Sequence, residues 1–220
     1  MGEFFIKTMN EEQYLQNFLS KGQMLFRHVE EFRKIEDGNI RGDKKEGTQH
    51  EKINIRVAPN TSKISLGGIG GKKFYIDWDA LKKAHPQLAI TTTQLTSFTL
   101  DYVADIHLYC ITYINSNTPN IDKVLNAICK LGKYSAVITN CAEFIEKVNK
   151  SIPNAKMGFV RYVEEEEIRS VFDKKTEYDY QNEFRIVKNA NGRMNSMMEI
   201  GKLSGFVCTS ESLHTLKQVL

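Results

Sequence analysis

The sequence has little of several residue types that would by themselves define a protein class. Its 220 residues include four cysteines, four prolines and a single tryptophan. The cysteines form no CxxC pair and their spacing matches no zinc pattern, so we expect neither a zinc module nor a disulfide scaffold. Sparse, unpaired cysteine suits a reducing cytosol, and we therefore expect a cytoplasmic protein.

Long apolar runs and a strong charge of one sign are also missing. No apolar run approaches 18 residues, so the sequence predicts no membrane span and no membrane partner. The opening MGEFFIKTMNEEQ lacks a basic start followed by a long apolar run, so no secretory signal is expected. The net charge of +3 argues neither for nor against a nucleic-acid partner.

The composition is that of an ordinary globular protein. Hydrophobic residues make up 41% and charged residues 26%, and the length suits a single domain spanning 1–220. Strand-like segments outnumber helical ones and the two are interspersed, which predicts an α+β fold. Asp105–Asn115 is the most strand-like segment, and its apolar run predicts a central strand buried on both faces. Ile121–Leu131 is a predicted helix that Gly132 ends.

Common catalytic motifs are missing from the chain. The glycine-rich GGIGGKK at Gly67–Lys73 is no Walker loop, because Lys72 is followed by Lys73 and a strand rather than by Ser or Thr and a helix. We predict a turn between two strands there. The five histidines are scattered without an HExxH motif, and no G-x-S-x-G nucleophile motif occurs. We therefore assign no metal ligands.

One polar pattern stands out in YDYQNEFRIV, Tyr178–Val187. Its aromatic and β-branched residues predict a β-strand. Because side chains alternate along a strand, Gln181, Glu183 and Arg185 would share one face. They would form either a solvated surface with an ordinary Glu/Arg pair or the wall of an active-site cleft.

The Gln181-Asn182-Glu183 triplet resembles the Q-x-E strand of one class of ADP-ribosyltransferases. Breaking the bond between nicotinamide and ribose develops positive charge on the ribose, which a fixed carboxylate stabilises. A polar side chain two residues away lies on the same face and can position the acceptor.

Other segments extend the resemblance over most of the chain. FIKTMNEEQYLQNFLSKGQMLF resembles the strand–helix–strand opening of DarT-type ADP-ribosyltransferases, with Lys7 where that family has His or, in other branches, Arg. The chain is also similar to a bacterial family of unknown function found near phage-defence loci. That family shares an Arg-Gly-Asp-x-x-Glu-Gly loop (Arg41–Gly47), a central strand like HLYCITY and a Lys…Tyr-x-x-Gln-x-Glu-x-Arg segment ending at Arg185.

The resemblance implies an ADP-ribosyltransferase-like fold of mixed, mostly antiparallel sheets around a cleft with flanking helices. It implies an NAD-dependent mono-ADP-ribosyltransferase acting as a toxin or phage-defence effector. NAD would be the substrate, a nucleic acid (RNA or DNA) or a protein the acceptor, and an antitoxin protein a partner.

The resemblance also implies roles for individual residues. Glu183 would be the catalytic carboxylate and Gln181 would orient the acceptor. Lys7 would lie near the nicotinamide ribose or a phosphate, and Arg41 would clamp the pyrophosphate, since guanidinium matches phosphate oxygens. Two further assignments concern the glutamate: Thr112 and Tyr113 loosely match the second-strand position that supports it, and Arg185 would keep it ionised.

Two other functions stay open at this point. A metal-dependent nuclease would use Asp43, Glu46 and lysine residues around a divalent ion. A non-enzymatic binding or sensor module of a toxin–antitoxin or defence system would present an exposed apolar patch and no polar cleft. Taken singly, Lys7 reads equally well as a surface lysine, and Arg41 as a partner of Asp43 or Glu46. Only the combination favours the transferase.

Overall fold

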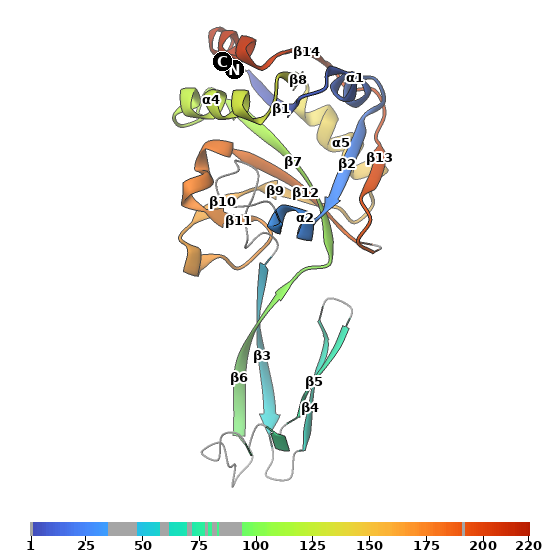
Figure 1. The fold of residues 1–220 in the computed structure, drawn as a ribbon, viewed down its shortest axis with the longest axis vertical. Helices are drawn as coiled ribbons and strands as arrows, with labels where there is room; N and C mark the ends of the chain where they lie inside the picture. Colours follow the sequence, from blue (N-terminus) through green and yellow to red (C-terminus); the bar gives the residue numbers. More distant parts are fainter. Residues whose placement is uncertain are drawn as a thin grey trace. The chain divides into compact units, whose positions relative to one another are not determined.

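The computed structural model describes residues 2–34, 48–57, 62–69, 72–77, 79–80, 83, 94–190 and 192–220. The chain divides into two compact units, one made of Met1–Gly47 with Asp105–Leu220 and the other of Thr48–Ala104. The described elements (Figure 1) are, in chain order, β1 (Glu3–Met9), α1 (Glu12–Lys21), β2 (Gln23–His28), α2 (Val29–Arg33), β3 (Thr48–Val57), β4 (Lys63–Ile69), β5 (Lys72–Asp77), β6 (Gln94–Val103), β7 (Ile106–Asn115), α4 (Ile121–Leu131), β8 (Tyr134–Ile138), α5 (Cys141–Ser151), β9 (Lys156–Phe159), β10 (Arg161–Val163), η2 (Glu165–Glu167), β11 (Asp173–Lys175), η3 (Thr176–Gln181), β12 (Glu183–Asn189), β13 (Ser196–Glu199), β14 (Gly205–Thr209) and η4 (Ser210–Gln218), where η marks a 3₁₀ helix.

The first unit is built on an eight-stranded sheet. Its strand order is β13-β2-β7-β1-β8-β14, with β12 paired to β7 and β9 paired to β12. Every pairing in this sheet is antiparallel, and among the described strands only the short β10–β11 pair is parallel. The predicted α+β class is confirmed, with a mostly antiparallel sheet.

Strand β7 is the axis of this sheet, as its long apolar run predicts. On one side it pairs with β12 from Ile106 to Thr112. On the other side it has two partners: β2 pairs with His107 and Leu108, and β1 with Thr112 and the residues after it. Since β1 and β2 pair with different halves of β7, the sheet opens between them opposite residues 109–111.

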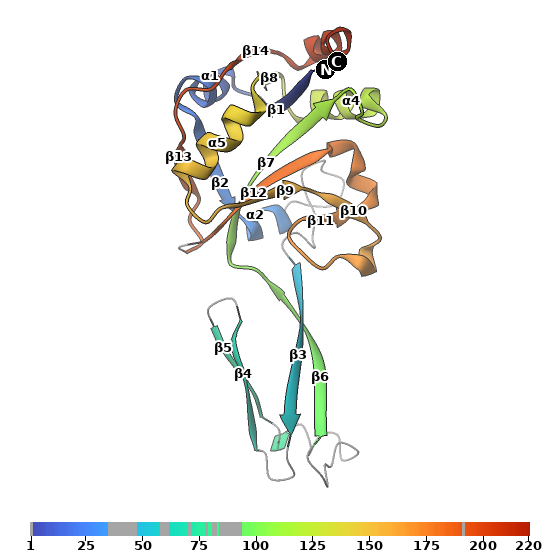
Figure 2. The same ribbon diagram turned by 180° about the vertical axis from the view of Figure 1, so that it is seen from behind.

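Apolar side chains cover both faces of the sheet. Helices α1 and α5 cover one face, where their Phe18 and Phe144 pack with Phe5 and Ile186 of the sheet (Figure 2). Helix α4 and η4 cover part of the other face through a second cluster, which includes Ile6. Amphipathic helices therefore enclose the sheet on both sides.

Gly22 ends α1, and its conformation explains why glycine is needed. Its φ is 65°, in the left-handed region, and its N–H donates to the Asn17 carbonyl. A Cβ at this position would lie 2.4 Å from the carbonyl oxygen of Gly201. Glycine alone satisfies both the backbone angle and this close approach.

The predicted strand Tyr178–Val187 is wrong in its first half. Thr176–Gln181 form a 3₁₀ helix, Asn182 follows with a φ of 39°, and the strand begins only at Glu183. The two tyrosines of this segment do not line a strand face; their rings lie near Lys174 and Lys123, with ring centroid to Nζ distances of 5.0 and 5.8 Å. Asparagine tolerates the left-handed conformation that turns the chain into the strand.

The second unit consists of two antiparallel strand pairs among its described residues. β3 and β6 pair over ten residues each. β4 and β5 pair with a register shift between Ser65 and Gly68. Residues 67–69 of the glycine-rich GGIGGKK segment belong to β4 and residues 72–73 to β5, as predicted for a link between two strands. The predicted turn itself, at Gly70 and Gly71, lies outside the described residues.

In the part of the chain that the structure describes, every helix is too short or too polar to cross a membrane.

Candidate functional site

A cavity of about 320 Å³ opens in the first unit where β1 and β2 separate. Its walls come from both strands, from the middle of β7, from the start of α1 and from the segment that carries Glu183. The lining residues are Ile6, Lys7, Thr8, Met9, Asn10, Glu11, Tyr14, Leu25, Arg27, Phe32, Leu108, Tyr109, Cys110, Ile111, Thr112, Leu131, Lys174, Gln181 and Glu183. This volume lies at the lower end of the range for small-molecule sites.

The gap between β1 and β2 follows from the hydrogen bonding of β7. Alternate residues of β7 turn their backbone groups toward β12, as Tyr113 does when its N–H donates to the Asn182 carbonyl (2.9 Å). Thr112, Cys110 and Leu108 therefore turn theirs to the opposite side. There Thr112 meets β1 and Leu108 meets β2. Cys110 lies between the two strands and faces the gap.

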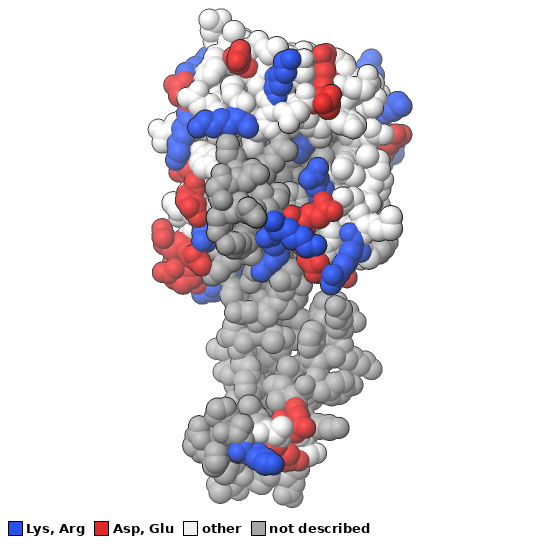
Figure 3. All heavy atoms as spheres, viewed as in Figure 1, with Lys and Arg blue, Asp and Glu red and all other residues white. Residues whose placement is uncertain are grey.

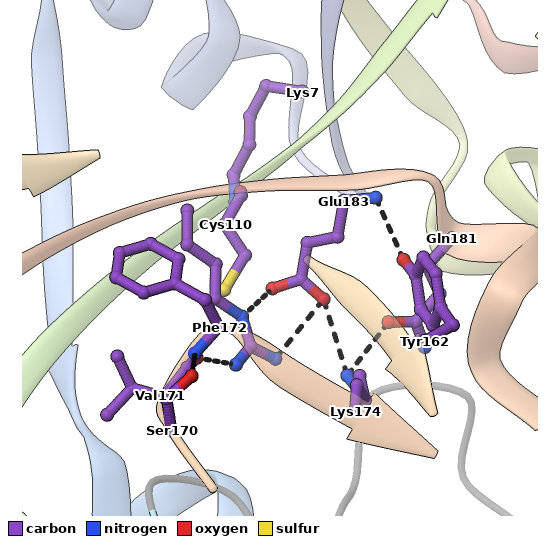
Figure 4. Close-up of polar contacts among 10 residues, drawn as sticks. Lys7, Cys110, Tyr162, Ser170, Val171, Phe172, Lys174, Gln181 and Glu183 are labelled. Atoms are coloured by element: carbon purple, nitrogen blue, oxygen red, sulfur yellow. Dashed lines mark hydrogen bonds and ion pairs between the residues drawn. The ribbon is translucent and has the colours of Figure 1, made fainter. Parts of the chain in front are cut away.

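Lys7 occupies this gap. Its Nζ donates to the Cys110 carbonyl at 2.7 Å and lies 4.5 Å from the centre of the Tyr109 ring. Figure 4 shows Lys7 approaching the backbone of Cys110 from one side, while the sulfur of Cys110 points to the other side, where Glu183 lies. Lys7 and Glu183 thus reach one cavity from opposite faces of β7.

The carboxylate of Glu183 is held by two buried cations. Arg185 donates from Nε to Oε1 at 2.6 Å, and the Lys174 Nζ lies 3.3 Å from Oε2 (Figure 4). Lys174 also donates to the Gln181 side-chain oxygen at 2.8 Å. The exposed fractions are 0% for Arg185, 3% for Lys174, 6% for Glu183 and 9% for Gln181. Lys174, Gln181 and Glu183 line the cavity, whereas Arg185 lies behind them.

These neighbours set the ionisation of Glu183. Burial alone would raise the pKa of its carboxyl group, but the charges of Arg185 and Lys174 and the hydrogen bond from Arg185 outweigh burial. The pKa of Glu183 is therefore well below its ordinary value. The carboxylate is therefore ionised at neutral pH.

A short loop keeps Arg185 in place. Asp173 accepts hydrogen bonds from the backbone N–H groups of Arg169 and Ser170 and from Arg161 Nε, each at 2.9 Å. The loop folded around this carboxylate presents the Val171 carbonyl to the Arg185 guanidinium. Asp173 thus orients the guanidinium that in turn holds Glu183.

Strand β10 supplies a further contact to Glu183. Tyr162 pairs with Lys174 across the parallel β10–β11 ladder. Its hydroxyl accepts a hydrogen bond from the backbone N–H of Glu183 at 2.9 Å. Burial, followed by the charge of Glu183, raises the pKa of Tyr162, so its hydroxyl stays protonated.

The structure brings together most of the residues predicted for the site. Lys7, Thr112, Gln181 and Glu183 all line the cavity, and Arg185 contacts Glu183 as expected. Gln181 reaches the site from the end of a 3₁₀ helix rather than from the same strand face as Glu183.

Two predicted residues lie elsewhere. Tyr113 is not in the cavity lining: its hydroxyl donates to Glu3 at 2.7 Å and its ring packs against Phe5 and Phe159. Arg41 lies outside the described residues, as do Asp43 and Glu46 of the nuclease alternative.

Lys174, Tyr162 and Arg27 are among the cavity or contact residues that received no role from the sequence. Either Lys174 or Lys175 fits the lysine of the Lys…Tyr-x-x-Gln-x-Glu-x-Arg segment, and the structure places Lys174 beside Glu183. Strand pairings bring Tyr162 and Arg27 to the site, and no local sequence pattern predicts these pairings.

The described residues hold no metal-type cluster. Within the described ranges, no group of three or more His, Cys, Asp or Glu side chains lies close enough to hold an ion. On the face drawn in Figure 3, the described basic and acidic side chains of the first unit are interspersed, with no broad area of one sign. Neither observation selects an acceptor.

No protein-family model, no curated protein and no solved structure matches the chain.

Proposed function

We propose that the protein is an NAD-dependent mono-ADP-ribosyltransferase with an ADP-ribosyltransferase-like fold. One observation carries the proposal: an ionised glutamate lies on the wall of a cavity that opens where two strands separate, with Gln181 beside it and Lys7 across β7. The biological role proposed with it is that of a cytoplasmic toxin or phage-defence effector, with a nucleic acid or protein as acceptor and an antitoxin as partner.

The site suits a ribosyl substrate. Leu25, Leu108 and Ile111 give the cavity apolar lining suited to a flat ring, and Glu183, Gln181 and Lys174 add polar groups. NAD supplies an ADP-ribosyl group whose bond to nicotinamide breaks with positive charge developing on the ribose. Glu183 lines the cavity and Arg185 does not, so a sugar bound there would lie beside Glu183.

Glu183 acts in this proposal as an electrostatic stabiliser and not as a base. Its carboxylate accepts hydrogen bonds from Arg185, Lys174 and Cys110. Because Glu183 lines the cavity, a ribose hydroxyl that binds there shares or replaces one of these donors. The lowered pKa of Glu183 makes it a poor proton acceptor but a constant negative charge. Lys174 fixes the distance between Glu183 and the amide of Gln181, which then orients the acceptor.

The nuclease alternative finds less support. The Glu183 oxygens already contact two cations, which leaves little reason for a divalent ion to bind there. The acidic residues assigned to that function lie outside the described part of the chain. The alternative of a non-enzymatic binding module does not explain why buried polar side chains lie together at a cavity.

The experiment is nicotinamide release from NAD by the purified protein, with and without total cellular RNA. Glu183→Gln should lower the rate at least about a hundredfold, the size of loss seen when one electrostatic group is removed from an active site. Glu177→Gln, an exposed glutamate on the 3₁₀ helix before the site, is the matched control and should keep the wild-type rate. Circular dichroism checks that both variants fold.

Absence of release in every condition, with no thermal stabilisation by NAD, would sink the proposal. Release that persists in Glu183→Gln would assign the reaction to another residue. Stimulation by RNA would identify a nucleic-acid acceptor, and its absence would redirect the search to proteins or DNA.

A further inference from the structure

Arg27 stands at the end of the cavity away from Glu183, with no role in the site described so far. It lies on β2 opposite Leu108 of β7, and both residues line the cavity. Its side chain is exposed and makes no ion pair or side-chain hydrogen bond with any described residue. A guanidinium beside apolar walls, without a protein carboxylate to neutralise it, is available to a ligand.

The strand register places Arg27 and Glu183 on the same face of the sheet. Arg27 is opposite Leu108, and Glu183 is opposite Thr112. Directly opposed residues of antiparallel strands share a face, and so do residues an even number apart on one strand. The next residue of β2 supports this, since His28 contacts His107 on the other face, with ring centroids 5.6 Å apart.

The distance between Arg27 and Glu183 sets the length of a ligand that could contact both. Leu108 and Thr112 are four residues apart on β7, which is roughly 13 Å along a strand at about 3.3 Å per residue. A ligand that touches Glu183 with a sugar and also reaches the Arg27 guanidinium must be longer than a nucleoside. It must carry an anion at its far part, and the planar fork of arginine favours phosphate oxygens.

We propose that Arg27 binds the diphosphate of the nucleotide substrate and thereby selects nucleotides over nucleosides. The inference rests on the proposed function for the identity of the group at the Glu183 end. It assigns to Arg27 the phosphate contact that the sequence suggested for Arg41. Leu25 and Leu108 line the cavity together with Arg27, so the guanidinium offers an anion-binding group next to apolar lining.

The test is binding, measured by isothermal titration calorimetry with ADP-ribose, inorganic pyrophosphate and adenosine. The wild-type protein is compared with Arg27→Gln, with Arg27→Lys and with Arg193→Gln as the control for an exposed arginine that pairs with Glu30. Losing a charge-assisted hydrogen bond should weaken ADP-ribose binding by about tenfold or more in Arg27→Gln. Arg27→Lys should restore part of the affinity, and adenosine binding should be unchanged in all variants.

ADP-ribose binding and nicotinamide release are measured separately, so a failure of one proposal can be told from a failure of the other. If the wild type releases nicotinamide but Arg27→Gln binds ADP-ribose as tightly as the wild type, the role of Arg27 is wrong and the transferase stands. If ADP-ribose binding depends on Arg27 but nicotinamide is never released, the phosphate end stands and the reaction is wrong. If the wild type binds neither ADP-ribose nor pyrophosphate, the role of Arg27 is overturned.

Discussion

Replacing Arg185 should lower the free energy of unfolding far more than replacing an exposed arginine would. Its guanidinium is 0% exposed, donates to the Glu183 carboxylate at 2.6 Å and also donates to the Val171 carbonyl. Breaking one side of a buried ion pair costs about 3–5 kcal/mol, because the remaining charge has lost its partner. Lys174 stays beside Glu183 and compensates in part, so we expect about 3 kcal/mol for Arg185→Met.

Urea unfolding followed by far-UV circular dichroism measures this loss. For a chain of this size, 3 kcal/mol corresponds to a melting temperature lower by roughly 6–12 °C. The control is Lys123→Met, which removes an exposed ion pair with Asp179 and should change stability far less. An unchanged slope of free energy against urea would show that the two forms unfold to similar states.

The double variant isolates the pair. Glu183→Gln together with Arg185→Met should be less destabilised than the sum of the two single changes, by about 2 kcal/mol. If Arg185→Met costs less than about 1 kcal/mol, or if the two changes simply add, then Arg185 and Glu183 do not form the buried pair described here.

The same variants predict how stability depends on pH. The folded-state pKa of Glu183 is lowered below that of the unfolded chain. Its contribution is therefore complete above the unfolded value, near 4.5, and is lost as the pH falls below it, when only the unfolded state takes up the proton. In Arg185→Met the pKa of Glu183 returns toward its ordinary value. The stability difference between wild type and variant should therefore be largest near pH 7 and should narrow in acid.

Three further changes test other parts of the structure. Burial lowers the pKa of His107 below 6.5, so the unfolded chain takes up a proton before the folded protein does as the pH falls. The variant His107→Gln should therefore lose less stability than the wild type between pH 7 and 5, and an equal loss in both proteins would contradict this. Gly22→Ala should cost about 2 kcal/mol or more by thermal unfolding, because a left-handed residue costs roughly 1 kcal/mol and its Cβ would also meet Gly201; a smaller loss would mean that the neighbouring backbone moves. Tyr162→Phe should lower the free energy of unfolding by about 1–2 kcal/mol, and it should speed hydrogen exchange at the Glu183 amide, which loses its acceptor. Unchanged exchange would exclude this hydrogen bond.

Strongly patterned segments of the sequence predicted their structure well. The apolar run from Asp105 gave the central strand, and Gly132 follows helix Ile121–Leu131 as predicted. From Glu183 onward the strand alternates as predicted, with Phe184 in the core and Arg185 on the opposite face. In these segments local propensity and burial favour the same structure, so one sequence suffices to predict it.

The segment before Glu183 was mispredicted because its aromatic residues looked like strand residues. Tyr178 and Tyr180 instead lie near lysines, and Asn182 turns the chain. Strand propensities take no account of a cation that packs on a tyrosine ring or of an asparagine in the left-handed conformation. Arg27 was missed for a different reason, since only the register between β2 and β7 brings it to the cavity. Register depends on pairings between distant segments, which no local window of sequence contains.

The position of Glu183 argues that its charge serves the cavity and not stability alone. Replacing a buried ion pair with apolar side chains is often neutral or stabilising, so stability alone does not favour a carboxylate at this position. A carboxylate kept only to neutralise Arg185 would have no need of the cavity wall. Glu183 instead lies on that wall beside Lys174 and Gln181, while Arg185 stays behind and Asp173 holds the supporting loop. A carboxylate that two buried cations keep ionised on a cavity wall is the arrangement that a developing positive charge in the cavity requires.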